Sequence, residues 1–315
     1  MKIKILKLIK IVTVNILLII LFLSVVEIFL AYNKFCEYRK YYIKEKIATV
    51  DELKTIFDFV FCRFKYSTEN FYQTKFFRPP AGLEYKDKPS IVLFGCSYAY
   101  GQNLENEETL SYQLSQYLKR TVYNFALCGG GLQDILHIIR NNKILNLFDI
   151  DTKNVQYVIY LYMFDHQRRL FVNVHAGEPE FKIVNGNFIE QKTNRFLLNS
   201  YITFYFKENE FKHSDKNKKW DLFCEYIKAI NKEVHEKFKN GNEETKFIIL
   251  AYIPPHGNED WSKLENEENL QIIKVDDLVS FAPFEKEYVT FDTLHPSALA
   301  WQVVVPKLAE ELNLE

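Results

Sequence analysis

Residues 90–101 read SIVLFGCSYAYG, and this stretch decides the fold class of the chain. The apolar run from Ile91 to Phe94 is typical of a short strand buried on both faces of a sheet. Gly95 then predicts a tight turn, and Ser97 stands between two glycines. A serine at the end of such a strand is a candidate nucleophile. The alternative is a simple turn with the Cys96 thiol packed beneath it.

Strands of this kind alternate with helical patterns along the rest of the chain. Further strands are expected at 121–125, 155–162, 246–253 and 271–275, and helices at 110–118, 133–147, 220–238 and 298–312. This alternation predicts a three-layer α/β/α fold with a central, mostly parallel sheet. Ligands of such folds bind at the carboxyl ends of the strands. Asn185-Gly186 between extended runs predicts a β-hairpin, within an insertion at about 171–194 near the edge of the sheet.

The N-terminal region contains an apolar run of 20 residues, from Ile11 to Leu30, whose only charged residue is Glu27. Such a helix would be about 30 Å long, the thickness of a bilayer core. A cleaved signal peptide is the alternative, but the run exceeds the usual apolar core of about 7–15 residues and no small-x-small cleavage site follows. We therefore expect a single-pass anchor. Basic residues flank both ends, so charge does not orient it, and the general habit of such anchors favours an extracytoplasmic main domain.

The expected organisation is a basic cytoplasmic tail (1–10), the anchor (11–30), a helical linker region (31–89) and the α/β domain (90–315). Residues 1–46 carry a net charge of +6, and the remainder carries −7. A mildly acidic main domain argues against a nucleic-acid partner, whose binding needs clustered positive charge. The basic segment beside an apolar run indicates membrane lipid as a partner.

Polar residues near the end of the chain could complete a site with Ser97. Asp292 and His295 are three residues apart, and Pro296 follows them. A turn of that length can bring the carboxylate to Nδ1 of the histidine, which leaves Nε2 free as a base. An isolated Asp-x-x-His is more often an exposed loop pair, so the assignment depends on its combination with the serine. No metal or cofactor is expected, because no Cys/His cluster has metal-ligand spacing.

In this order on an alternating α/β chain, the motifs resemble the SGNH (GDSL-like) hydrolases, over about residues 90–312. The block 95–97, Gly-Cys-Ser, resembles that family's Gly-Asp-Ser block, with cysteine in the place of aspartate. The block 124–129 resembles the second one, with Gly129 as its glycine, and 292–296 matches the Asp-x-x-His-Pro block fully. The resemblance implies Ser97, His295 and Asp292 as a catalytic triad, with backbone N–H groups of Ser97 and Gly129 in the oxyanion hole.

The third block departs from the family pattern. The family usually has Gly-x-Asn-Asp, in which the asparagine donates to the oxyanion, but residues 160–169 read YLYMFDHQRR. An ionised Asp165 would repel the developing negative charge. His166 could donate if its ring faces the site, or it could be a structural residue, and Arg168 or its neighbour Arg169 could add positive charge. The third oxyanion donor therefore stays open.

Cys96 and Cys128 precede site residues on neighbouring strand ends. They could form a disulfide, but two buried thiols are the preferred interpretation because disulfide geometry is demanding. Cys96 itself is not expected to be the nucleophile, since residues 96 and 97 would point to opposite faces. His175 in the insertion and His256 after Pro254-Pro255 are weaker candidates for the site.

The resemblance implies a membrane-anchored serine esterase that removes or transfers small O-acyl groups, such as acetyl groups, on cell-envelope glycans through an acyl-serine. Water as the acceptor would give an esterase and a sugar hydroxyl a transferase. The substrate would be a small acyl ester or an O-acylated glycan, with lipid esters next. The alternative from another class is a non-catalytic binding or assembly protein that retains the fold, and the altered third block is its main support.

Overall fold

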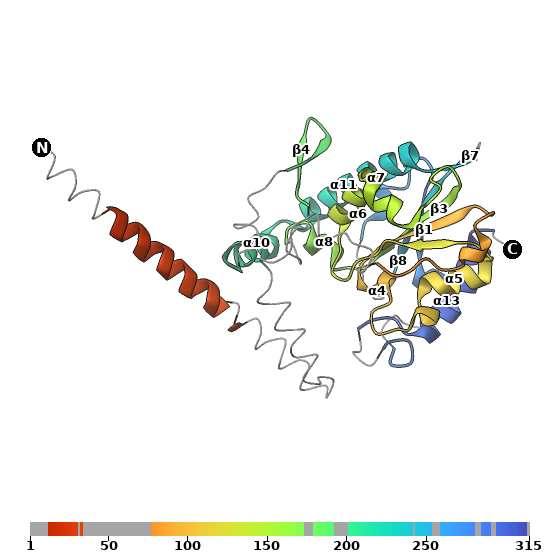
Figure 1. The fold of residues 1–315 in the computed structure, drawn as a ribbon, viewed down its shortest axis with the longest axis horizontal. Coiled ribbons are helices and arrows are strands. Elements are labelled where there is room, and N and C mark those ends of the chain that lie inside the picture. Colours follow the sequence, from red (N-terminus) through yellow and green to blue (C-terminus); the bar gives the residue numbers. More distant parts are fainter. Residues whose placement is uncertain are drawn as a thin grey trace, which may run out of the picture.

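The computed structural model describes residues 12–30, 32–33, 77–172, 179–191, 201–241, 243–253, 259–280, 285–290 and 294–313. Its centre is a five-stranded sheet in the order β2-β1-β3-β8-β9, and every neighbouring pair is parallel (Figure 1). The strands are β1 Ser90–Gly95, β2 Val122–Asn124, β3 Val155–Tyr162, β8 Lys246–Ala251 and β9 Leu270–Lys274. These bounds confirm the five strands expected from the apolar runs.

The two faces of the sheet are both buried, which explains why its strands are apolar runs rather than alternating patterns. Val92 and Phe94 of β1 point into one hydrophobic core, whereas Ile91 and Leu93 point into the other. All four side chains are fully buried. A strand with apolar residues on both faces is stable only when helices cover the sheet from both sides.

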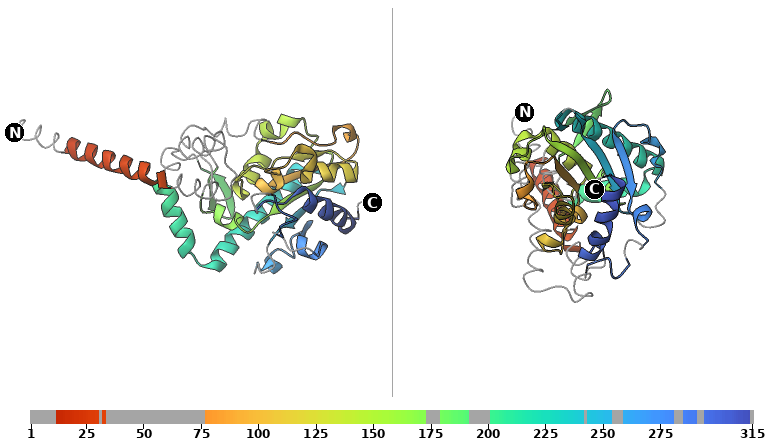
Figure 2. Two further views of the ribbon diagram at one scale, coloured as in Figure 1. Left: turned by 90° about the horizontal axis from the view of Figure 1, so that it is seen from below. Right: turned by 90° about the vertical axis from the view of Figure 1, so that its right-hand side faces the viewer.

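Helices cover each face, and the views in Figures 1 and 2 show the resulting three layers. The first core lies under α6 Leu132–Arg140, α7 Asn142–Leu145 and α11 Lys216–Lys237. The second core lies under α5 Leu110–Leu118 and α13 Ala298–Glu311. The predicted α/β/α fold with a parallel sheet is therefore confirmed.

The remaining elements connect these parts or lie at the periphery of the domain. They are α4 Ser97–Tyr100, α8 His166–Arg169, α10 Tyr201–His213, α12 Val275–Leu278, the 3-10 helices Leu83–Tyr85, Asn106–Glu108, Asn146–Phe148 and Trp261–Lys263, and the strands β6 Lys239–Asn240 and β7 Glu243–Glu244.

The helix expected at 133–147 is two helices, α6 and α7, so that prediction was wrong in its middle. Asn141 separates them with φ −103° and ψ 98°, outside the helical region. Its side chain accepts a 3.1 Å hydrogen bond from the N–H of Lys143 and thereby caps α7. Asparagine competes with helical hydrogen bonding in this way, and this favours a break over a continuous helix.

The expected hairpin is present as β4 Phe181–Val184 and β5 Asn187–Glu190. Asn185 and Gly186 have φ of 51° and 75°, as a type I′ turn requires. The sequence led us to expect this hairpin near the edge of the sheet. It lies instead over α6 and α11. Phe188 packs on Tyr226 of α11 with ring centroids 4.3 Å apart, and Arg140 of α6 donates to the Phe188 carbonyl.

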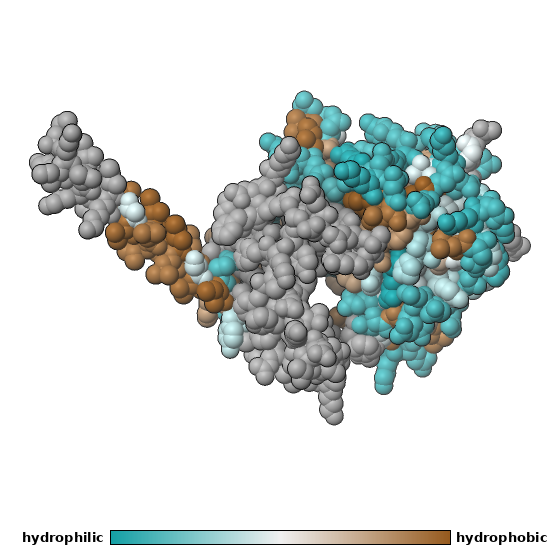
Figure 3. All heavy atoms as spheres, viewed as in Figure 1, coloured by the Kyte–Doolittle hydropathy of each residue, from teal (hydrophilic) through white to brown (hydrophobic). Residues whose placement is uncertain are grey.

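The N-terminal helix Val12–Leu30 has a mean hydropathy of 2.6 and none of it is buried. Its visible surface in Figure 3 is almost wholly apolar. Nineteen residues at about 1.5 Å each extend over about 28 Å. The helix is long and apolar enough to cross a membrane, and a signal sequence meets the same criteria.

Candidate active site

The turn from β1 into α4 places Ser97 at the carboxyl end of the sheet. Gly95 has φ of 153°, in a region that favours glycine. A Cβ at this position would lie 2.8 Å from the Cβ of Ala99 and 3.1 Å from the carbonyl oxygen of Leu161. Only a glycine lets the strand pass so closely beneath the helix. Cys96 is the N-cap of α4 and Ser97 is its first residue.

Ser97 and His295 meet at this edge. Ser97 Oγ and His295 Nε2 are 2.8 Å apart, at hydrogen-bonding distance. Ser97 is 7% exposed, so its hydroxyl is shielded from bulk water without being sealed. This is the nucleophile-to-base separation that acyl transfer requires. The two residues that sequence patterns proposed as nucleophile and base are therefore brought together.

Hydrogen bonds hold the backbone near His295, and one aromatic ring lies against its imidazole. The N–H of Thr290 donates a 2.7 Å hydrogen bond to the carbonyl oxygen of His295. Ser297 caps α13, because its hydroxyl accepts from the N–H of Ala300 at 3.3 Å. The ring of Tyr98 lies edge-on to the imidazole, with centroids 5.2 Å apart. The two hydrogen bonds hold the chain on either side of His295, and only Tyr98 among these residues contacts the imidazole itself.

Three candidates from the sequence lie outside the described residues, namely Asp292, His175 and His256. The assignment of Asp292 as the carboxylate that orients His295 therefore stays a prediction. Within the part of the chain that the structure describes, no group of three His, Cys, Asp or Glu side chains could hold a metal ion.

The second loop, after β2, is held by Asn124. Its buried side chain donates to the Ala99 carbonyl oxygen at 2.8 Å and accepts from the N–H of Ala126 at 3.0 Å. Gly129 follows with φ of 80°, a left-handed conformation. Across the described ranges, the N–H groups of Gly129 and Ser97 have no hydrogen-bond acceptor. Two backbone donors are thus unengaged in the two loops for which the family resemblance implies an oxyanion hole.

The structure places His166 in the core rather than at an open site. Its side chain is fully buried, stacks on Tyr160 and shares a 2.5 Å hydrogen bond through Nδ1 with the Tyr160 hydroxyl. Burial lowers the pKa of His166 well below its usual value, and the Arg169 charge adds to this, so the ring stays neutral. Of the two expectations for His166, this geometry favours the structural role.

Asp165 and Arg168 belong to an ion-pair network instead of a free cationic or acidic site. Arg168 donates to both oxygens of Asp165, at 2.6 and 3.0 Å, and to Glu208 of α10 at 3.0 Å. Burial alone would raise the pKa of Asp165, but the hydrogen bond from Arg168 and the charges of Arg169 and Arg168 outweigh it and lower the pKa. The expectation that Arg168 contributes charge to the oxyanion finds no support in these contacts.

Cys96 and Cys128 are both free thiols. Cys96 is fully buried. Burial, with a smaller contribution from the nearby Cys96, raises the pKa of Cys128 to about 12. At neutral pH this thiol is protonated, and a protonated thiol is a poor nucleophile or metal ligand.

Sequence reasoning did not name Tyr98 and did not separate Arg169 from Arg168, although Tyr98 and Arg169 both shape the site. Tyr98 contacts the base, and an aromatic residue directly after the serine could have been noticed. Arg169 donates to the carbonyl oxygen of Gly130 at 2.7 Å and to Asp165 at 3.0 Å. No sequence signal separates Arg169 from Arg168, because only the direction of α8 decides which side chain turns inward.

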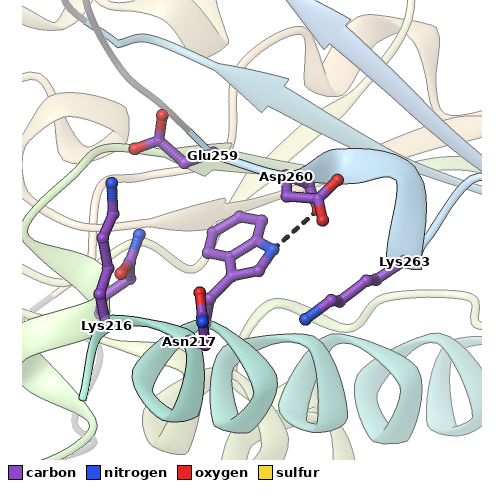
Figure 4. A pocket seen from close by; sticks show the side chains of 7 residues that line it. Lys216, Asn217, Glu259, Asp260 and Lys263 are labelled. Atoms are coloured by element: carbon purple, nitrogen blue, oxygen red, sulfur yellow. Dashed lines mark hydrogen bonds between the residues drawn. The ribbon is translucent and has the colours of Figure 1, made fainter. Parts of the chain in front are cut away.

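A separate cavity of about 90 Å³ lies beside α11, lined among others by Gln167, Trp220 and Glu259 (Figure 4). Trp220 Nε1 donates to the carbonyl oxygen of Asp260 at 2.8 Å, as the dashed line in Figure 4 marks. Neither Ser97 nor His295 lines this cavity. It opens on the α11 side of the sheet, whereas His295 precedes α13, which covers the other face.

No protein-family model and no curated protein matches this chain. Solved structures match it weakly. A member of the lipolytic protein G-D-S-L family from Veillonella parvula has 11% identity and a TM-score of 0.41, with 71% of this chain and 97% of that chain covered. The esterase EstA from Pseudoalteromonas sp. has 12% identity and a TM-score of 0.41, with 72% of this chain and 97% of that chain covered. An acetyl xylan esterase from Butyrivibrio proteoclasticus has 9% identity and a TM-score of 0.44, with 72% of this chain and 65% of that chain covered.

Proposed function

We propose that this protein is a serine esterase, with Ser97 as the nucleophile and His295 as its general base. The observation that carries the proposal is the 2.8 Å contact between Ser97 Oγ and His295 Nε2 at the carboxyl edge of a parallel sheet. Ligands of open α/β sheets bind at this edge. A serine hydroxyl in contact with a histidine at this ligand-binding edge supports a catalytic role more than a purely structural one.

In the proposed first step, Ser97 Oγ attacks the carbonyl carbon of an ester while His295 Nε2 takes the hydroxyl proton. The tetrahedral oxyanion accepts hydrogen bonds from the N–H groups of Ser97 and Gly129, each worth about 3 kcal/mol of transition-state stabilisation. His295 then returns the proton to the leaving alcohol, and an acyl-serine remains. Water deprotonated by His295 releases the acid, or a sugar hydroxyl takes the acyl group. Asp292 is proposed to orient His295.

The proposed substrates are small O-acyl esters, in particular acetyl groups on cell-envelope glycans, and lipid esters are the next candidates. The apolar helix Val12–Leu30 supports a position at a membrane, where an anchored esterase would meet surface glycans. The proposed arrangement has one membrane pass and an extracytoplasmic main domain.

A non-catalytic binding protein is the second candidate, and the third block (residues 160–169, called the third segment below) favours it. His166 and Asp165 are engaged in structural contacts, so neither supplies the oxyanion donor that the usual asparagine would provide. Two unengaged backbone N–H groups nevertheless support catalysis, because such donors alone stabilise an oxyanion.

A fluorophosphonate probe and a chromogenic acetyl ester separate the two candidates. We expect labelling at Ser97 and ester hydrolysis in the wild type, with both abolished in Ser97→Ala and in His295→Ala. Ser90→Ala is a matched control, since Ser90 is 6% exposed and begins β1, at the end of that strand remote from Ser97. His137→Ala, which removes a histidine paired with Glu190 on the hairpin, is the control for the base. Folded wild type without labelling or turnover would favour the binding protein instead.

A further inference from the structure

Arg169 lies against the glycine loop at 129–131 and is almost completely buried, with its side chain 9% exposed. Its Nη1 donates to the carbonyl oxygen of Gly130 at 2.7 Å. A Cβ built at Gly131 would come within 3.3 Å of the Arg169 Cβ, so the side chain also packs directly on the loop. Gln133 of α6 donates through Nε2 to the carbonyl oxygen of Arg169 at 2.7 Å, and this bond holds the backbone of Arg169 in place.

The peptide unit between Gly130 and Gly131 is therefore held from both sides. Arg169 donates to the carbonyl oxygen of Gly130, and the N–H of Gly131 donates to Asp134 Oδ2 at 2.8 Å. A peptide group is planar, so two hydrogen bonds at opposite ends fix its orientation. Three successive glycines have large conformational freedom, and without such contacts the loop would sample many arrangements. The Gly129 N–H lies two peptide units before this anchored peptide.

The Arg169 anchor is itself fixed by charge. Asp165 Oδ2 accepts from Nε of Arg169 at 3.0 Å, and Arg168 holds the same carboxylate. A buried guanidinium with a charge-assisted partner is strongly constrained, because moving it would leave two charges unpaired in the interior. The loop is thus tied to a rigid network and not to a mobile surface side chain.

We propose that Arg169 is a positioning residue that holds the Gly129 N–H in place for the oxyanion, acting through the Gly130 carbonyl oxygen. This inference rests on the proposed esterase function. It accounts for how the site can work without the asparagine of the third block. Instead of a side chain that touches the oxyanion, the third segment supplies an arginine that orders the backbone donor.

The test uses the full chain and compares Arg169→Met, Arg169→Lys and Arg140→Met. Arg140 is a matched control, because its Nε donates to a carboxylate and its Nη1 to a backbone carbonyl, as in Arg169, but its partners are Glu233 and Phe188. The measurements are kcat and KM with an acetyl ester, the rate of fluorophosphonate labelling of Ser97, and the thermal midpoint.

We expect Arg169→Met to lower kcat and the labelling rate about 10- to 100-fold with KM within about twofold, somewhat less than removal of a whole oxyanion donor. Arg169→Lys should recover part of the loss, since an ammonium can still donate to a carbonyl. Arg140→Met should keep wild-type kcat even if its thermal midpoint falls equally.

Unchanged kcat in Arg169→Met, or an equal loss in both methionine variants, would overturn the positioning role while leaving the esterase intact. If Arg169→Met does not fold, Arg169→Lys decides the question. The inference is refuted if this folded variant keeps the wild-type kcat while faster amide hydrogen exchange shows that the loop at Gly130 has lost its order. A wild type with neither turnover nor labelling overturns the proposed function itself.

Discussion

Asn124 Nδ2 donates a 2.8 Å hydrogen bond to the carbonyl oxygen of Ala99, and this bond joins the two loops of the candidate site. Ala99 belongs to α4, the short helix that begins at Ser97. The same amide accepts from the N–H of Ala126, in the segment that leads to Gly129. One buried side chain therefore sets the distance between the nucleophile and the second loop.

We predict that Asn124→Ala destabilises the protein by about 1–3 kcal/mol, because buried polar partners lose their hydrogen bonds. It should also lower kcat in the folded fraction, since α4 and the second loop would no longer be held together. Asn231→Ala is the control, because Asn231 is also buried and donates to a backbone carbonyl, of Glu268. Urea titration and ester hydrolysis measure both effects. Equal kcat in the two variants would contradict this role for Asn124.

Gly129→Ala tests the left-handed conformation of the second loop. An alanine with φ of 80° costs about 1–2 kcal/mol relative to glycine, and relief of that strain would turn the N–H away. Gly186→Ala is a matched control with φ of 75° at the tip of the hairpin, where an added Cβ meets nothing within 4 Å. Both variants should lose similar stability in thermal denaturation. Only Gly129→Ala should lose labelling of Ser97, and labelling at the wild-type rate would argue against an oxyanion role.

His166 predicts a pH dependence of stability. Burial lowers its folded-state pKa well below the unfolded value of about 6.5. Between these two values the unfolded chain binds more protons, so stability present above pH 6.5 is lost as the pH falls, by up to about 1.4 kcal/mol per pH unit. His166→Gln should be less stable at pH 7.5 but show a flatter decline towards pH 5.5 in urea titrations. Parallel declines in the two proteins would show that His166 is not responsible.

Leu21→Arg tests whether the N-terminal helix spans a membrane. An arginine at the centre of a spanning helix costs about 2.5–3.5 kcal/mol on insertion scales. The wild type should remain in the membrane pellet after alkaline extraction with its N-terminal segment intact, and the variant should be released. Leu83→Arg, at a site 46% exposed on the domain, is the control. A wild-type chain found soluble and cleaved after the apolar run would identify a signal sequence.

The sheet was predictable from the sequence because each strand is a local apolar run bounded by breaking residues. Ile91 to Phe94 and Val155 to Tyr162 could be recognised as doubly buried strands from their composition alone. The break at Asn141 was missed, since asparagine occurs within helices as well as at their caps. The side of the domain on which the hairpin packs was also missed, because it depends on a contact between Phe188 and Tyr226 that is remote in sequence.

For the candidate site, turn residues and motif spacing were enough to propose Ser97 and His295, because these are local properties, and the resemblance to a known family added Gly129. The tertiary structure alone decided that Ser97 Oγ and His295 Nε2 lie 2.8 Å apart. It also decided the orientation of the third segment. A short helix exposes neighbouring side chains to different surroundings, so the packing around α8, and not the residue types, buried His166 and turned Arg169 onto the glycine loop.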